Sequence, residues 1–333
     1  MKAFLIDRYG KKETGHIDDV PTPALRDDDV LVRVHAASVN ALDTRIRTGE
    51  FKVILPYRLP LVLGNDLAGT VERVGAGVHE FKPGDEVYAR VEDDRIGTFA
   101  EFVAVKAASV ARKPGNLDMM EAASLPLVAL TAWQALVETA RVKPGQKVFI
   151  QAGSGGVGTV AIQLAKHLGA FVATTTSTAN VAWVKDLGAD VVIDYRQQDF
   201  ATELRDYDVV LNSLGKDELF RSLQILRPGG HLISISGPPT PAFATARGLA
   251  WPVKQVMRLL SHRIRSKARQ RGVDYTFLFM RADGDQLGEI TALVESGALR
   301  PVIDRVFPFQ QTENALAYVE SGRTKGKVVI EMR

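Results

Sequence analysis

A glycine-rich turn between two patterned segments is the first feature of this sequence that could do chemistry. Residues 153–158 read Gly-Ser-Gly-Gly-Val-Gly, after a short apolar run at 147–152 and before a helical pattern at 157–168. Where glycines lead from a strand into a helix, the backbone can approach a pyrophosphate, whose charge is favoured by the free amides and the helix dipole. A turn that serves only tight packing is the alternative. The residues predicted to bind a dinucleotide diphosphate are Ser154, Gly155, Gly156, Val157 and Gly158.

The next strand-like segment ends in hydroxyl groups where an NAD site usually has an acid. That acid lies about 20 residues beyond the glycines and binds the 2′-hydroxyl of the adenosine ribose. Here the distance falls among residues 174–178, and no acid appears before Asp186. A carboxylate would repel a 2′-phosphate, whereas hydroxyls and amides can donate hydrogen bonds to one. The pattern favours NADPH over NADH, with Thr176, Ser177 and Asn180 at the phosphate.

Cysteine and histidine, the residues that most often bind zinc, are scarce in this chain. It has no cysteine, and its six histidines, at 16, 35, 79, 167, 231 and 262, show no metal-binding spacing. A tetrahedral zinc needs such ligands, so we predict no metal. Without a Lewis acid, a simple ketone is hard to reduce, because the alkoxide would need another strong stabiliser. A quinone or an α,β-unsaturated carbonyl is easier, because its charge spreads into a hydroquinone anion or an enolate.

Two regions with different secondary-structure patterns must position these residues. The first third is strand-like and rich in turns, as in the alternating run at 30–36, and predicts a compact β-rich domain. From about residue 119 helices and strands alternate, beginning with a helical pattern at 121–140. Strict alternation predicts a parallel, doubly wound sheet, so the expected class is α/β. The expected strands lie at 147–152, 171–175, 190–194, 208–212, 231–236 and 275–280.

Several motifs resemble one known family. They are Ser-Val-Asn-Ala-Leu-Asp at 38–43, Gly-Asn-Asp-Leu-Ala-Gly at 64–69, Gly-Thr-Phe-Ala-Glu-Phe at 97–102, Leu-Thr-Ala-Trp-Gln at 130–134 and the glycine turn. Together they resemble the medium-chain dehydrogenase/reductase superfamily and its zinc-free quinone oxidoreductase, or zeta-crystallin-like, branch. Segments 275–280 and 300–304 are more similar to alkenal/enone reductases and reticulon-interacting mitochondrial oxidoreductases.

This resemblance implies a domain plan and a quaternary state. A GroES-like substrate and catalytic domain would comprise 1–122 and 283–333, and a Rossmann NADP-binding domain 123–282. Where zinc alcohol dehydrogenases of the superfamily have Gly-His-Glu, this chain has Gly64-Asn65-Asp66. The family usually forms dimers, so a homodimer is expected.

The resemblance also implies roles for single residues. Asn40 and Thr131 would lie near the nicotinamide and the acceptor, whereas Asp43 is expected to cap the following helix. Tyr57 is a candidate proton donor, with packing between prolines as the alternative. Tyr195 would contact the 2′-phosphate. Several relatives have a lysine at the position of Asn180, and the candidate replacements are Arg196, Lys325 and Lys327.

Polar and aromatic residues near the strand ends complete the expected cofactor site. Asn212 and Ser236 follow the fourth and fifth strands, at the edge where a doubly wound sheet binds its ligand. Simple turns are the alternative. Phe277, Phe279 and Met280 are expected on the nicotinamide side, or else as core residues of the sixth strand.

Charge is concentrated in one segment. The chain has a net charge of +3, yet residues 254–271 hold seven Lys or Arg and no acid. Apolar residues recur there at helical spacing and predict an amphipathic helix with a cationic face. One interpretation of 253–271 is contact with an anionic membrane or an acidic partner, and the other is a solvated face or a cover over the substrate cleft. Nucleic-acid binding would depend on this segment alone, and no nucleic-acid partner is expected. The apolar residues of the expected face are Val253, Val256, Met257, Leu260, Ile264 and Ala268.

Composition bounds the remaining possibilities. A hydrophobic content of 46% and a charged content of 24% exclude a disordered or fibrous chain. The N-terminal sequence has no secretory pattern and no segment reaches the length of a membrane span, so we expect a cytoplasmic protein. The sequence predicts an NADPH-dependent quinone or enone reductase. An enoyl-thioester reductase and an NADPH-binding structural or regulatory protein are the alternatives.

Overall fold

Residues 1–11 and 13–332 are described by the computed structural model, in which the chain divides into two units. Unit 1 comprises Met1–Leu130 and Arg281–Arg333, and unit 2 comprises Thr131–Met280. The sequence placed the divisions at 122/123 and 282/283. The first division of the structure instead falls inside helix α3 (Pro126–Trp133).

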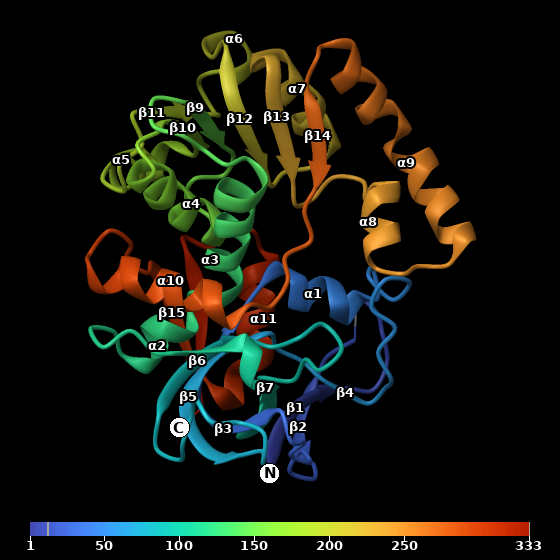
Figure 1. The fold of residues 1–333 in the computed structure, drawn as a ribbon, viewed down its shortest axis with the longest axis vertical. Helices are drawn as coiled ribbons and strands as arrows, with labels where there is room; N and C mark the ends of the chain where they lie inside the picture. The colour runs from blue at the N-terminus through green and yellow to red at the C-terminus, as the bar shows by residue number, and fades with distance from the viewer. Residues whose placement is uncertain (12, 333) are drawn as a thin grey trace. The chain divides into compact units, whose positions relative to one another are not determined.

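Unit 1 is built around a seven-stranded, mostly antiparallel sheet (Figure 1). Its centre is β3 (Asp29–Val39), which pairs along one edge with β5 and along the other with β7 and β16. The other strands of this sheet are β5 (Asp66–Val74), β6 (Glu86–Arg90), β7 (Phe102–Lys106), β8 (Val110–Arg112), β15 (Ile303–Pro308) and β16 (Lys327–Glu331). A smaller sheet contains β1 (Lys2–Ile6), β2 (His16–Asp19) and β4 (Leu61–Val62).

Short helices complete unit 1. They are α1 (Ala41–Thr48), η1 (Ala107–Ser109), α2 (Met119–Ala123), α10 (Gly284–Glu295), η4 (Phe309–Gln311) and α11 (Thr312–Glu320). The strand β16, close to the C-terminus, pairs with β3 from the first third of the chain. The two distant parts of the chain therefore form one sheet, as the GroES-like expectation required.

Unit 2 is a six-stranded parallel sheet in the order β11-β10-β9-β12-β13-β14. Its strands are β9 (Lys147–Ile150), β10 (Phe171–Thr176), β11 (Val191–Asp194), β12 (Tyr207–Asn212), β13 (Leu226–Ser234) and β14 (Asp274–Phe277). The strand order reverses beside β9, which is the arrangement of a doubly wound dinucleotide-binding sheet. The predicted fold class is confirmed.

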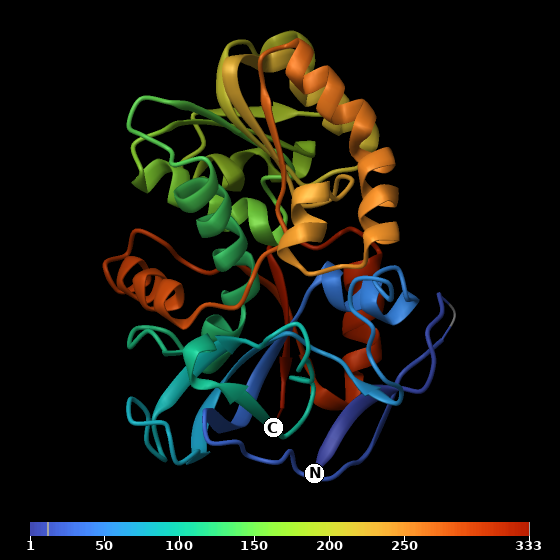
Figure 2. The same ribbon diagram turned by 45° about the vertical axis from the view of Figure 1, so that its right-hand side comes forward.

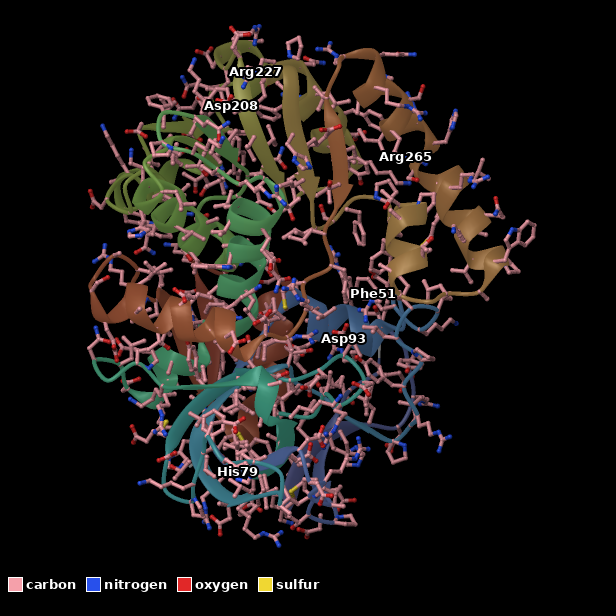
Figure 3. All side chains as sticks on the ribbon, viewed as in Figure 1. Phe51, His79, Asp93, Asp208, Arg227 and Arg265 are labelled. Carbon is pink, nitrogen blue, oxygen red and sulfur yellow. The ribbon has the colours of Figure 1, made fainter. Side chains whose placement is uncertain are left out.

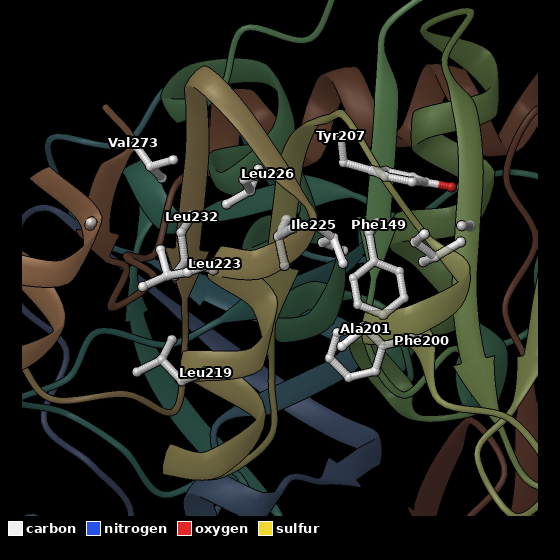
Figure 4. Packing of buried hydrophobic residues seen from close by; sticks show 14 of the residues in the cluster. Phe149, Phe200, Ala201, Tyr207, Leu219, Leu223, Ile225, Leu226, Leu232 and Val273 are labelled. Atoms are coloured by element: carbon white, nitrogen blue, oxygen red, sulfur yellow. The ribbon is translucent and has the colours of Figure 1, made fainter. Parts of the chain in front are cut away.

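Helices cover both faces of this sheet (Figures 1 and 2). They are α4 (Gly156–His167), η3 (Thr178–Asn180), α5 (Val181–Lys185), α6 (Phe200–Glu203), α7 (Lys216–Ile225), α8 (Pro241–Ala246) and α9 (Trp251–Gln270), with a π-helical stretch, η2, at Gln134–Thr139. Under α7 and α9 the core packs Phe149 against Phe200 with ring centroids 4.9 Å apart (Figure 4). Ile264 and Ala268 of α9 belong to the same core and fix which face of α9 is buried.

Three expectations about elements need correction. The helix expected at 121–140 is broken after Ala123, because Pro126 starts α3 and disfavours helical geometry in the residue before it. Strand β14 ends at Phe277 rather than residue 280. In α9 the buried residues are Met257, Ser261, Ile264 and Ala268, whereas Val256 and Leu260, expected inside, are both 56% exposed.

Among the described residues, none of the helices is both long and apolar enough to cross a membrane.

Candidate functional site

The glycine turn leads from β9 into α4 with little room for side chains. A Cβ on Gly158 would lie 2.2 Å from the carbonyl oxygen of Ala152, and one on Gly153 would lie 2.3 Å from Oγ1 of Thr174. Gly155, the residue before the helix, has φ −85° and a nearest contact of 3.3 Å. The first and third glycines of the motif are therefore required by packing, and the second is the least crowded of the three.

The main chain bends sharply at Ala152, just before the glycine turn and the start of α4. Ala152 has a positive φ of 53°, an uncommon backbone conformation for a residue with a side chain. This bend is held by hydrogen bonds to β10: Ala152 N donates to Thr175 Oγ1 at 3.2 Å, and Gly153 N donates to Thr175 O at 2.9 Å. The amides of the first turn of α4 have no partner within the helix, so they are available to a diphosphate.

The hydroxyl-rich end of β10 lies beside this turn. Thr174, Thr175 and Thr176 are all buried, and Thr174 Oγ1 donates to Ile150 O at 2.6 Å. The Thr174 side chain therefore joins β10 to β9. Asn180 Nδ2 donates to Ser177 Oγ at 3.1 Å, and Asn180 Oδ1 accepts from Trp183 Nε1 at 3.1 Å.

Ser177 is the hydroxyl best prepared to donate to a phosphate. Because its oxygen accepts from Asn180, its own hydrogen remains available, and no acceptor for it is found within 1–11 and 13–332. Tyr195 follows β11, its N–H donates to Thr176 O at 3.1 Å, and its side chain is 60% exposed. The fold thus brings Thr176, Ser177, Asn180 and Tyr195 together, and their contact with a 2′-phosphate stays a prediction.

An acid does lie near this strand end, contributed by a different strand. Asp194 is in register with Thr176. Its carboxylate accepts from Arg196 N at 3.0 Å and from Gln197 Nε2 at 2.8 Å, and hydrogen bonding from the Thr178 hydroxyl is the main cause of its lowered pKa. These hydrogen bonds hold the Asp194 carboxylate against residues of its own loop. A local pattern around β10 does not show Asp194, because β10 and β11 come together only in the folded chain.

A buried amide network fixes the carboxyl ends of β9, β12 and β13. Asn212 Nδ2 donates to Gln151 Oε1 at 2.6 Å, and Asn212 Oδ1 accepts from Ser234 Oγ at 2.5 Å. Ser236 Oγ donates to Leu214 O at 2.6 Å. The Asn212 side chain is fully buried and bonded to its neighbours, and the predicted contact of this strand end with the cofactor stays a prediction. Gln151, which the sequence analysis did not single out, completes the network.

Phe279 lies in an aromatic cluster beneath α8. Its ring centroid is 5.7 Å from that of Phe243, and the Arg247 guanidinium lies 4.8 Å from its centroid. Phe277 packs edge-on against Phe243 at 5.1 Å. Phe277 is buried, whereas Phe279 is only partly buried, and for Phe279 both interpretations, core or nicotinamide side, stay predictions.

In unit 1, Asn40 lies in a buried charged cluster. Asn40 Nδ2 donates to Asp66 Oδ2 at 2.8 Å, and its Oδ1 accepts from the Lys327 ammonium. Asp66 also accepts from Ser38 Oγ at 2.8 Å and from Leu127 N at 2.9 Å. Asn40 is only 5% exposed, so these bonds orient it rigidly.

Lys327, a predicted phosphate ligand, lies in the same buried cluster as Asn40. Its Nζ donates to Asn40 Oδ1 and to Val39 O and lies 3.4 Å from Asp66 Oδ2, and the residue is 5% exposed. Burial lowers the pKa of Lys327, and the charges of Asp66 and Asp43 oppose that shift. These bonds occupy the Lys327 ammonium inside unit 1 and argue against its predicted contact with the 2′-phosphate.

Asp43 caps helix α1, as expected. Its Oδ2 accepts from Asn40 N at 2.7 Å, and its Oδ1 accepts from Asn65 Nδ2 at 2.7 Å. Complete burial raises the pKa of Asp43 to about 6, although both hydrogen bonds oppose this shift. Asn65 and Asp66, at the positions of the metal motif of zinc relatives, are thus bonded to side chains of this chain. Within the described residues, no group of three or more His, Cys, Asp or Glu could hold a metal ion.

Tyr57 and Thr131 are the remaining predicted catalytic residues. Tyr57 Oη donates to Asp93 O at 2.5 Å, and burial raises the Tyr57 pKa well above its usual range. Both facts argue against Tyr57 as proton donor. Thr131 lies in α3 and is 3% exposed. Its predicted contact with the acceptor stays a prediction.

Comparison with known proteins agrees with this geometry. A family model described as "Alcohol dehydrogenase GroES-like domain" matches residues 26–115, and one described as "Zinc-binding dehydrogenase" matches residues 187–330. The chain is 34% identical to "NAD(P)H oxidoreductase RTN4IP1, mitochondrial" of Danio rerio, over 100% of this chain and 91% of that protein. It is 33% identical to "NADPH-dependent alkenal/one oxidoreductase, chloroplastic" of Arabidopsis thaliana, over 99% of this chain and 79% of that protein.

Solved structures lead to the same assignment. The quinone oxidoreductase of Coxiella burnetii superimposes with a TM-score of 0.87 at 33% identity, covering 100% of this chain and 99% of that one. The Escherichia coli quinone oxidoreductase complexed with NADPH superimposes with a TM-score of 0.83 at 25% identity, covering 100% of both. The chain belongs to the medium-chain dehydrogenase/reductase superfamily, with relatives among NAD(P)H-dependent quinone and alkenal/one oxidoreductases. It is an oxidoreductase of that superfamily.

Proposed function

We propose that this protein transfers hydride from NADPH to a quinone or an α,β-unsaturated carbonyl. The observation that carries the choice of cofactor is Ser177. Its hydroxyl hydrogen is available at the end of β10, next to the glycine turn, and no carboxylate stands on that strand end. The nearest acid, Asp194, has its oxygens bonded to its own loop. A 2′-phosphate would find donors here, and a ribose 2′-hydroxyl would lack its usual acceptor.

Each part of the chain then has a distinct task. The first turn of α4 would hold the diphosphate, and Ser177, Asn180 and Tyr195 would hold the 2′-phosphate. When bound, the nicotinamide supplies a hydride, which carries two electrons and one hydrogen nucleus to the acceptor. Asn40, held by Asp66 and Lys327, would donate or accept a hydrogen bond at the acceptor with little reorganisation.

The acceptor also gains one proton to complete the reduction. Because the Tyr57 hydroxyl donates to Asp93 O and its pKa is raised, we assign this proton to solvent. An acceptor whose charge is delocalised after hydride addition does not need a metal. A conjugated carbonyl or a quinone meets this condition, and a simple ketone does not.

Similarity to proteins named as alkenal/one and quinone oxidoreductases supports this acceptor class. A second candidate acceptor is an enoyl-thioester, because the CurK enoyl reductase structure superimposes with a TM-score of 0.84 at 25% identity over 100% of this chain.

The test is a panel of turnover measurements. NADPH and NADH oxidation would be followed at 340 nm with ortho- and para-quinones, alkenals, alkenones, enoyl-thioesters and simple ketones. We expect turnover with NADPH and a quinone or enone and none with simple ketones. Turnover only with enoyl-thioesters would identify the second candidate. Tight NADPH binding without turnover on any acceptor would contradict an enzymatic role and favour a structural or regulatory one.

A further inference from the structure

The outer side of helix α9 is an unusual surface for this chain. Among the described residues, nine large apolar side chains are more than one third exposed. Four of these nine lie on α9. We call these four residues and the helix cations beside them the α9 surface. The four are Trp251 (72% exposed), Val256 (56%), Leu259 (78%) and Leu260 (56%).

The packing of α9 decides which way these side chains face. Met257, Ser261, Ile264 and Ala268 are buried against unit 2, where α9 runs beside β14 and contacts α7 and α8 (Figures 1 and 2). Residues two apart on a helix differ by about 200°, so Leu259 points opposite to Met257. Val256, Leu259 and Leu260 have the i, i+3, i+4 spacing of one continuous stripe on the solvent side.

The same helix is strongly cationic. From residue 219 to residue 273 the sequence contains no Asp or Glu, and seven Lys or Arg of this stretch lie at 254–271. Arg263 and Lys267 lie over the Phe220 ring, each 5.1 Å from its centroid. For Lys254, Arg258, Arg265 and Arg269, no carboxylate partner exists in the described part of the chain. Figure 3 shows Arg265 on this helix.

Cations around an apolar stripe fit an anionic lipid surface better than other partners. An in-plane amphipathic helix inserts Leu, Val and Trp at the level of the headgroups, while Lys and Arg reach anionic headgroups beside them. A second copy of α9 would bring two strongly positive faces together, which is unfavourable. Nucleic acid would pair with the cations but would leave the apolar stripe without a suitable contact.

We propose that α9 docks this protein on the surface of a membrane that contains anionic lipid. Its first half would lie in the headgroup region through Trp251, Val256, Leu259 and Leu260, and its cations would pair with lipid phosphates. This membrane binding would be peripheral and reversible, because one partly exposed helix face contributes limited apolar area. The proposal does not depend on the cofactor or the acceptor.

The test is co-sedimentation of the full chain with two kinds of vesicle. One is pure phosphatidylcholine and the other contains about one third phosphatidylglycerol, enough to give a negative surface potential. We expect binding only to the second kind, at low salt, and its loss at high salt, because surface charges are screened. Trp251 fluorescence should shift to shorter wavelength on binding, and Trp251→Phe should abolish that shift.

Two variants and two matched controls locate the binding surface. Leu259→Ser with Leu260→Ser removes the apolar centre, and Val53→Ser with Val306→Ser removes two exposed apolar residues elsewhere. Arg258→Gln, Arg265→Gln and Arg269→Gln together remove three helix charges. Their control removes three exposed charges outside the acid-free stretch: Lys143→Gln, Lys185→Gln and Lys216→Gln.

Each α9 variant should weaken vesicle binding by at least about tenfold, and each control by less than about twofold. Unchanged thermal midpoints would show that the variants fold. The proposal is overturned if the wild type does not bind phosphatidylglycerol vesicles, or if the controls lose binding as much as the α9 variants. It is also overturned if Leu259→Ser with Leu260→Ser dissociates a dimer in sedimentation velocity, because a second copy would then occupy the surface. NADPH turnover in solution should be unaffected, so this failure and a failure of the proposed function are distinguishable.

Discussion

The ammonium of Lys327 lies 3.4 Å from Oδ2 of Asp66, and both side chains are almost completely buried. Lys327 begins β16 and Asp66 begins β5, and the two strands lie on opposite sides of β3. The ion pair therefore joins a strand close to the C-terminus to a strand from the first quarter of the chain, across β3. Asn40, at the end of β3, bonds to both partners and is held between them.

Removing the lysine should leave a buried uncompensated carboxylate. Lys327→Met is expected to lower the free energy of unfolding by about 3–5 kcal/mol, the usual cost of breaking a buried pair from one side. Urea unfolding would measure this. Lys325→Met, at an exposed neighbour, should change stability by less than about 0.5 kcal/mol. Adding Asp66→Asn to Lys327→Met should cost less than the sum of the single changes. Equal stability of the two lysine variants would contradict a buried ion pair.

Asp43 should make stability depend on pH in an unusual direction. Burial raises its pKa from 3.8 to about 6 in the folded chain, so between these values the folded state keeps a proton that the unfolded state has lost. Its contribution is full below about pH 4 and is lost as the pH rises through 6, by roughly 3 kcal/mol. The difference in unfolding free energy between wild type and Asp43→Asn should therefore fall by about that amount from pH 4 to pH 7. Parallel stability curves for the two proteins would show that Asp43 is not protonated in the folded state.

Ser177→Asp should move cofactor preference toward NADH. The new carboxylate would repel a 2′-phosphate and could accept from a ribose 2′-hydroxyl. We expect the ratio of kcat/KM for NADPH to that for NADH to fall by about tenfold to a hundredfold. Ser177→Ala, which only removes the donor, should cause a smaller fall. If neither variant alters the ratio, the phosphate does not bind at this strand end.

Substitutions of two glycines in the turn should distinguish an effect on stability from an effect on cofactor binding. In Gly158→Ala the new Cβ would lie 2.2 Å from a backbone oxygen, so the main chain must shift and stability should fall by about 1–3 kcal/mol. Gly155→Ala has a nearest contact of 3.3 Å and a φ that any residue adopts. It should lose less stability than Gly158→Ala yet bind NADPH less tightly in a fluorescence titration, because the methyl group would stand where we expect the diphosphate to approach. Equal losses of stability would mean that Gly155 is also a packing glycine.

Tyr57→Phe should keep nearly full turnover. Its hydroxyl donates to the Asp93 carbonyl, and its raised pKa makes it a poor acid. We expect kcat within about threefold of wild type and a loss of about 1 kcal/mol of stability from the missing hydrogen bond. A hundredfold fall in kcat at unchanged stability would restore Tyr57 as the proton donor.

Much of unit 2 follows from local sequence patterns. Alternating apolar strands and helices predict a parallel sheet because each crossover must cover one face of that sheet. The glycine motif predicts the turn because its constraints act within six residues, as the close approach of Gly158 to Ala152 illustrates. The hydroxyl run at the end of β10 lies beside that turn for the same reason, since β9 and β10 are neighbouring strands joined by one helix.

The charged cluster of unit 1 was decided only by the tertiary structure. Asp66 and Lys327 are separated by 261 positions, so no local pattern shows that a lysine would supply the positive charge beside Asn40. Asp194 reaches the end of β10 through strand pairing, and the burial of Ser261 rather than Leu260 depends on how α9 rotates onto the core. The amino-acid sequence by itself determined the fold class, the glycine turn and the absence of an acid at the end of β10, because local geometry governs these. Long-range packing decided the raised pKa of Asp43, the buried ion pair of Lys327 and the exposed face of α9, because burial and charge pairing exist only in the folded chain.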